Sequence, residues 1–100
     1  MAYRVIWSDS ARSDLRSIVR YIARDDQTIA RRFGERIIST VEKITAFPRS
    51  GRMVPEQRND LIREIILSPY RIIFQIDDAA LRINVMKIWH SARGSVSFDK

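Results

Sequence analysis

Hydrophobic and polar positions in the first half of the chain follow one alternating segment and then two helical repeats. Residues 3–7 alternate with period two, which is typical of a strand. After Ser8, Asp9 and Ser10, which offer helix N-caps, apolar residues recur at helical spacing over residues 11–25. A second helical repeat runs from Ala30 to Phe47 and stops at Pro48, which cannot continue a helix. The pattern therefore predicts a strand followed by a hairpin of two amphipathic helices.

The second half of the chain reads as three strands behind a long irregular segment. Apolar, β-branched runs occupy residues 61–67, 70–77 and 81–90, and the short breaks between them favour antiparallel neighbours. Residues 48–60 carry several arginines and are expected to be irregular. The order β-α-α-β-β-β predicts an α+β fold, with the helix hairpin packed on one face of a small, four-stranded antiparallel sheet. We expect a single domain at residues 1–94 and a short C-terminal tail at 95–100.

Composition narrows the chemistry that such a domain can perform. Fifteen Arg and three Lys against twelve acidic residues give a net charge of +6, which suits a polyanionic or acidic partner, although base composition of the genome is an alternative cause. The absence of Cys excludes disulfides and thiol chemistry, and a single His makes a metal site unexpected. With no Gly-rich phosphate loop and no apolar run of membrane length, we expect no cofactor, no membrane contact and a cytoplasmic location.

Two groups of side chains are candidate binding sites. The first recurs every fourth residue along the first helix and forms a basic ridge for an acidic partner: Arg12, Arg16, Arg20 and Arg24. A solvated helix face is the simpler explanation of that ridge. The second group comes from the loop and the late strands and is predicted to line a basic, partly aromatic concavity on the uncovered face of the sheet: Arg52, Arg63, Tyr70, Arg71, His90 and Arg93.

The second group suits phosphate chemistry, because arginines stabilise added negative charge and Tyr or His can transfer protons. Each member also has a structural explanation. Tyr70 can be a core aromatic residue, His90 a surface or capping residue, and Glu64 can pair with an Arg on a neighbouring strand.

The sequence resembles the RelE/ParE superfamily of type II toxins over roughly residues 3 to 94. The resemblance rests on Ala11-Arg12-Ser13-Asp14-Leu15, on Phe47-Pro48-Arg49-Ser50-Gly51-Arg52 with Val54-Pro55-Glu56, on Arg63-Glu64 and Tyr70-Arg71-Ile72-Ile73-Phe74, and on Ile88-Trp89-His90-Ser91-Ala92-Arg93. It implies a growth-arresting toxin in a hetero-oligomer with a cognate antitoxin. The antitoxin is expected to lay an acidic and apolar C-terminal segment over the helix hairpin and the sheet, with the arginine ridge as its docking surface.

The superfamily contains two activities, and the resemblance favours one of them. A metal-independent, ribosome-dependent endoribonuclease of the RelE branch would use Glu56 or Glu64 with Arg71 and His90, but Phe98 stands where that branch benefits from a Tyr. The Pro-Arg-Ser-Gly-Arg and His-Ser-Ala-Arg segments look more like the ParE branch, which inhibits DNA gyrase, blocks replication and is associated with plasmid stabilization. We therefore expect a gyrase inhibitor with no firmly assigned catalytic residue. A plain nucleic-acid-binding module is a further hypothesis, suggested by charge alone.

Overall fold

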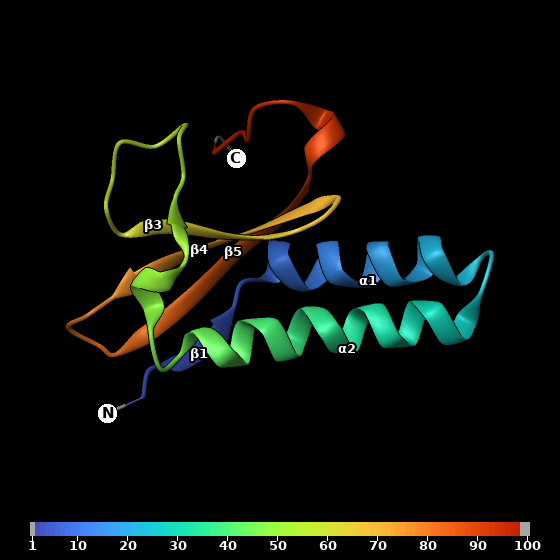
Figure 1. The fold of residues 1–100 in the computed structure, drawn as a ribbon, viewed down its shortest axis with the longest axis horizontal. Helices are drawn as coiled ribbons and strands as arrows, with labels where there is room; N and C mark the ends of the chain where they lie inside the picture. Colours follow the sequence, from blue (N-terminus) through green and yellow to red (C-terminus); the bar gives the residue numbers. More distant parts are fainter. Residues whose placement is uncertain (1, 99–100) are drawn as a thin grey trace.

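A computed structural model describes residues 2–98, in which one strand and two helices precede the remaining strands (Figure 1). The elements along the chain are β1 (Arg4–Trp7), α1 (Asp9–Ala23), α2 (Gln27–Ile44), the 3-10 helix η1 (Pro48–Ser50), β2 (Arg52–Met53), β3 (Ile62–Leu67), β4 (Tyr70–Asp77), β5 (Arg82–His90) and the 3-10 helix η2 (Ser91–Arg93). The predicted order β-α-α-β-β-β is confirmed. The segment predicted to be irregular also contains η1 and the two-residue strand β2.

The strands form one sheet in the order β1-β5-β4-β3-β2. Neighbours are antiparallel except β1 and β5, which run parallel with Val5 opposite Ile83. The sequence predicted four strands, all antiparallel. That prediction is wrong in two details, because β2 is a fifth strand and the β1–β5 pair is parallel. Strands joined by short turns must be antiparallel, but most of the chain lies between β1 and β5, so their relative direction is not fixed by a turn.

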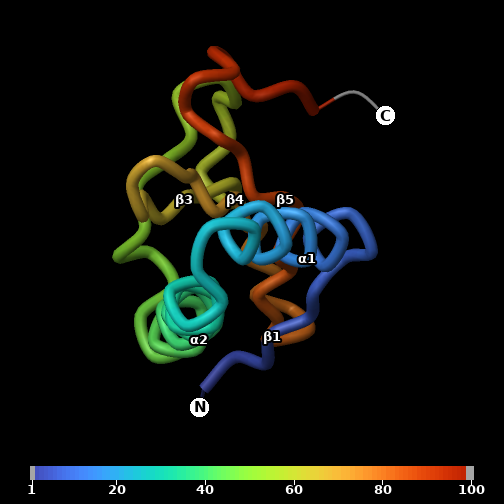
Figure 2. Tube along the Cα trace, turned by 90° about the vertical axis from the view of Figure 1, so that its right-hand side faces the viewer, coloured from blue at the N-terminus to red at the C-terminus, as the bar shows by residue number. Residues whose placement is uncertain are grey.

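Both helices cover the same face of the sheet, as predicted (Figure 2). Their apolar stripes meet the inward side chains of the central strands in one core cluster: Ala11, Ile18, Ile37 and Val41 from the helices, and Leu67, Tyr70, Ile72, Val85 and Ile88 from the strands. Burying each large aliphatic side chain contributes about 1.5–3 kcal/mol, so this cluster holds the two layers together. In residues 2–98 we find no helix that combines the length and the apolar character needed to cross a membrane.

The opposite face of the sheet carries a smaller cluster and is partly covered by the end of the chain. Val54, Ile62, Ile73, Trp89 and Val96 pack together there. In Figure 2 the segment that follows β5 lies on the side of the sheet away from the helices. Residues 95–98 of the predicted tail thus return over the sheet, and Asp99 and Lys100 lie outside the described residues.

Candidate functional site

Four charged side chains form a chain of ion pairs on the face of the sheet that the helices leave uncovered. Arg52 Nε donates to Glu64 Oε2 at 2.5 Å, and Arg71 Nε donates to Glu64 Oε1 at 2.6 Å. The two Nη atoms of Arg71 donate to the carboxylate of Glu56 at 2.9 and 2.8 Å. Two cations and two anions therefore alternate, and the network is formally neutral.

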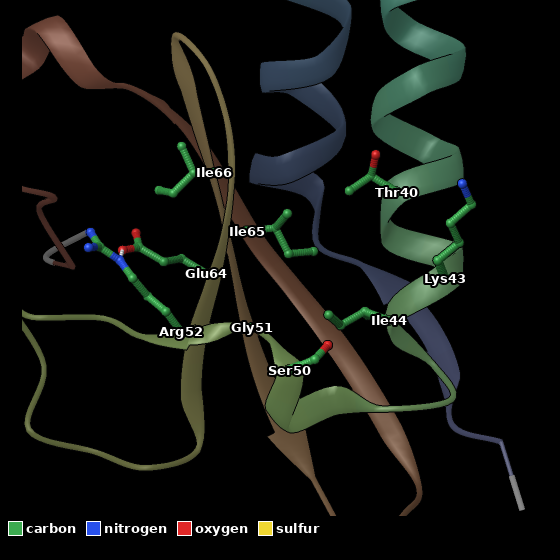
Figure 3. A pocket seen from close by; sticks show the side chains of 9 residues that line it. All are labelled: Thr40, Lys43, Ile44, Ser50, Gly51, Arg52, Glu64, Ile65 and Ile66. Atoms are coloured by element: carbon green, nitrogen blue, oxygen red, sulfur yellow. Dashed lines mark hydrogen bonds and ion pairs between the residues drawn. The ribbon is translucent and has the colours of Figure 1, made fainter.

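The strand register brings these residues together. Arg52 on β2 lies directly opposite Glu64 on β3, and Arg71 on β4 lies opposite Ile66, the next residue of β3 on the same face. Figure 3 shows this alternation, with Glu64 and Ile66 on one side of β3 and Ile65 on the other. Glu56 comes from the loop that follows β2. Period-two alternation thus places the network on a single face.

Burial makes the network strong. The side chain of Glu64 is fully buried, and that of Arg71 is 11% exposed. Hydrogen bonds from Arg71 lower the pKa of Glu56 to about 2, with a further contribution from the backbone N–H of Val96. The pKa of Arg71 is raised, chiefly by its hydrogen bonds to Glu56. Every nitrogen of the Arg71 guanidinium is therefore engaged by a carboxylate of the same chain.

The network also fastens the end of the chain. Glu56 Oε2 accepts a hydrogen bond from the Val96 N–H at 2.9 Å, and Trp89 Nε1 donates to the carbonyl oxygen of Gly94 at 3.0 Å. The guanidinium of Arg93 lies 4.1 Å from the centre of the Trp89 ring. What remains open beside the network is a hollow of about 400 Å³, lined by Arg52, Pro55, Glu56, Ile66, Arg71, Ser91 and Ser95.

The single concavity predicted for Arg52, Arg63, Tyr70, Arg71, His90 and Arg93 is not formed. Arg52, Arg71 and Arg93 lie on the uncovered face, but Tyr70 belongs to the core beneath the helices. Tyr70 pairs with His90 in the β4–β5 register, and their rings meet edge to face at 5.1 Å. Adjacent strand residues such as Tyr70 and Arg71 must point to opposite faces, which is why the set is divided.

Arg63 and His90 both have local structural contacts. Arg63 donates to the carbonyl oxygen of Gly51 at 3.0 Å and to Asp60, and so holds the loop before β3. His90 Nδ1 accepts the N–H of Ala92 at 3.0 Å and caps η2. Of the residues named for a nuclease, Glu56 and Glu64 both contact Arg71. The side chain of His90 lies with that of Tyr70 on the opposite face of the sheet.

The arginine ridge of α1 lies on the surface. Arg12, Arg16, Arg20 and Arg24 are all exposed, and among the described residues only Arg12 of these four forms an ion pair, with Asp9 at 2.5 Å. The helix α2 adds three more exposed arginines that form no ion pair within residues 2–98: Arg31, Arg32 and Arg36. The sequence prediction missed this second group. Its signal was available, because these arginines fall between the apolar positions Ala30, Phe33 and Ile37 and so belong to the polar face of the helix.

Comparison with known proteins agrees with the fold. The family described as the ParE toxin of the type II toxin–antitoxin system parDE matches residues 5–94. The Toxin RelE2 of Caulobacter vibrioides is 26% identical over 90 residues, which is 90% of this chain and 97% of that protein.

Two solved structures share the fold at low identity. A chain of the RelBE2 toxin–antitoxin complex of Mycobacterium tuberculosis has a TM-score of 0.67 at 18% identity, covering 90% of this chain and 99% of its own. A chain of the chromosomal ParDE system of P. aeruginosa has a TM-score of 0.71 at 18% identity, covering 89% and 96%. Since the family match spans nearly the whole folded region, this chain belongs to the ParE toxins of type II toxin–antitoxin systems, within the RelE/ParE superfamily.

Proposed function

We propose that this toxin arrests growth by binding DNA gyrase and blocking replication, without cleaving RNA. The observation that carries the proposal is the state of Arg71, whose guanidinium is taken up by Glu56 and Glu64 in a network that also holds the end of the chain. Three of the five N–H donors of this guanidinium are bonded to carboxylates, and its side chain is only 11% exposed, so little of it is open to a scissile phosphate. Inhibition by binding needs only a complementary surface and asks no proton transfer of these side chains.

The proton-transfer groups of a nuclease are also poorly placed. Glu56, with a pKa of about 2, is a weak base at neutral pH, and general bases work best with a pKa near the working pH. The side chain of His90 lies on the opposite face of the sheet from that of Arg71. Phe98 has no ionisable group and so cannot transfer a proton. Together these placements support a binding mechanism over hydrolysis.

The second candidate is ribosome-dependent cleavage of messenger RNA. It is favoured by the relative named Toxin RelE2 and by the fold shared with E. coli RelE, for which the TM-score is 0.60 at 16% identity. For this chain, cleavage would require the RNA to reach the two N–H groups of Arg71 that the network leaves unbonded, or the network to open.

Purified toxin should be added in parallel to gyrase with relaxed plasmid and to ribosomes translating a defined messenger RNA. We expect supercoiling to be inhibited and the messenger RNA to stay intact. Toxin premixed with excess antitoxin serves as the control and should restore supercoiling. Cut messenger RNA together with undisturbed supercoiling would contradict the proposal and establish the nuclease.

We also propose that an antitoxin neutralises this chain in a hetero-oligomer. The similar chains of M. tuberculosis, P. aeruginosa and E. coli come from toxin–antitoxin systems or complexes. The exposed arginines of α1, most of them without an ion pair in the described part of the chain, support an acidic partner on the helix hairpin.

A further inference from the structure

A hollow of about 420 Å³ lies on the helix side of the sheet, apart from the Arg71 network. One wall comes from α1 and the other from the start of β4 and the end of β5, and the lining residues are Ser17, Ile18, Tyr21, Tyr70 and His90. Tyr70 and His90 are paired in the strand register. The hollow is therefore built from a helix and two strands that the core holds in place.

Three of the lining residues carry rings, and they belong to a larger aromatic cluster. The Tyr70 ring meets that of His90 edge to face at 5.1 Å and that of Phe33 on α2 at 5.6 Å. Tyr21 is 66% exposed and so leaves aromatic surface open to a partner. An aromatic wall with a few polar groups set into it is the usual composition of a binding site.

The hydroxyl of Tyr70 is a polar group without a partner. Tyr70 is only 9% exposed, and its hydroxyl forms no hydrogen bond within residues 2–98. In that part of the chain only Arg82 Nε is both fully buried and unpaired, so the Tyr70 hydroxyl must reach the surface where Tyr70 lines the hollow. Burial raises the pKa of Tyr70, so the hydroxyl keeps its proton at neutral pH. It can therefore donate to a ligand.

His90 provides a second donor at the same place. Its Nδ1 accepts the N–H of Ala92 at 3.0 Å, so the neutral ring carries its proton on Nε2, which forms no hydrogen bond in the described residues. Ser17 adds a hydroxyl, and none of the lining residues is acidic. The hollow thus suits a ligand that presents an apolar or aromatic surface together with a hydrogen-bond acceptor.

The charges beside the hollow are positive. Arg20 and Arg24 follow Ser17 and Tyr21 by three residues, a spacing that makes side chains neighbours on a helix. Both arginines are exposed and form no ion pair within residues 2–98. The two acidic residues of α1 already have partners in the fold. A second copy of this chain would bring its own charge of +6 to these arginines, so charge complementarity favours an acidic partner.

We propose that this hollow anchors the toxin to gyrase by receiving an apolar or aromatic side chain that acidic residues of gyrase flank. That side chain would pack against Tyr21 and Tyr70, an acceptor beside it would bond the Tyr70 hydroxyl, and the acidic residues would reach Arg20 and Arg24. This inference rests on the proposed gyrase target and adds the place of contact. Arg20 and Arg24 also belong to the ridge of α1, so an antitoxin docked there would exclude gyrase.

Tyr70→Phe tests the donor, because it removes the unpaired hydroxyl and keeps the ring. The toxin concentration that half-inhibits supercoiling should rise roughly three- to tenfold, and the affinity for gyrase measured without DNA should fall by a similar factor. Urea unfolding should be unchanged, since the hydroxyl has no partner in the fold. Tyr3→Phe is the matched control, because the Tyr3 hydroxyl bonds Asp78 away from the hollow, and it should leave inhibition unchanged. Unchanged inhibition by Tyr70→Phe would overturn the proposal.

Tyr21→Ala tests the aromatic wall independently. The half-inhibiting concentration should rise at least about tenfold, as for a truncated aromatic residue at the centre of an interface. Phe47→Ala is the matched control, since Phe47 is a 74% exposed aromatic residue just beyond the C-terminal end of α2, and it should have little effect. Equal effects of both variants, or weaker antitoxin binding with inhibition unchanged, would overturn the proposal. Failure of the unmodified toxin to inhibit gyrase would instead reject the proposed function, and this inference with it.

Discussion

Arg71 shows how one residue type supports two different expectations. An arginine on a late strand suits phosphate binding, yet three of the five donors of this planar group are bonded here to two carboxylates. Removing Arg71 would leave its carboxylate partners unpaired, and removing a carboxylate would leave Arg71 short of a partner. Either change would cost several kcal/mol, because an unpaired charge inside a protein is poorly solvated. The network is therefore first a requirement of the fold, and any contact with a target must use the atoms that it leaves free, such as the Nη atoms of Arg52.

The pH dependence of stability follows from the state of Glu56. Its pKa is about 2 in the folded chain against an ordinary value of 4.5, so its contribution to stability is complete above pH 4.5 and is lost as the pH falls toward 2. Glu56→Gln should lower the free energy of unfolding by roughly 2–3 kcal/mol at pH 7, and by much less near pH 2. Urea denaturation at both pH values measures the difference. Glu42→Gln, at an exposed position of α2, should change neither value by more than about 0.5 kcal/mol.

At the scale of the elements, sequence patterns predicted what is local and missed what depends on a distant partner. The bounds of β4 were predicted in full, because turn residues flank a continuous apolar run. The parallel direction of β1 and the pairing of β2 depend on segments far away in the sequence. The division of Tyr70 from Arg71 did have a signal, since adjacent strand residues alternate, but the predicted site grouped residues by chemistry and ignored that alternation.

The contact between α1 and β5 also could not be predicted. The β4–β5 register shifts between Ile73 and Phe74, leaving an extra residue on β5, where a bulge disturbs the regular ladder. Two side chains from the start of α1 bond the backbone there: Ser8 Oγ donates to the Met86 carbonyl oxygen at 2.9 Å, and Asp14 accepts the Ile88 N–H at 2.9 Å. Helix and strand are thus fixed to each other by polar contacts as well as by the core.

Asp14→Ala should therefore destabilise the fold by about 1–3 kcal/mol, because it leaves a partly buried N–H without its acceptor. Thermal and urea unfolding of the purified toxin would measure the loss. Asp9→Ala is the matched control on the same helix, and it should cost less than about 1 kcal/mol because its pair with Arg12 is exposed. Equal losses in the two variants would contradict a structural role for the Asp14 bond.

At the scale of the whole molecule, the packing decides which charges remain available to a partner. The helices cover one face of the sheet, and the end of the chain and the neutral ion-pair network occupy the other. The α1–α2 hairpin extends beyond the sheet in Figure 1, with exposed arginines on both helices. The net charge of +6 is therefore offered to solvent largely by side chains that the fold does not use.

The arginine ridge of α1 can be tested against this general positive charge. Arg16→Glu with Arg20→Glu should slow association with the antitoxin and weaken its affinity tenfold or more at low salt, roughly the range in which steering by charge acts. Arg31→Glu with Arg32→Glu makes the same change in charge on α2, so a ridge that docks the antitoxin predicts a clearly smaller loss for this control. Surface plasmon resonance at two salt concentrations separates the two cases. Salt screens long-range attraction equally for both variants, and only a local contact at the ridge leaves a difference between them at high salt.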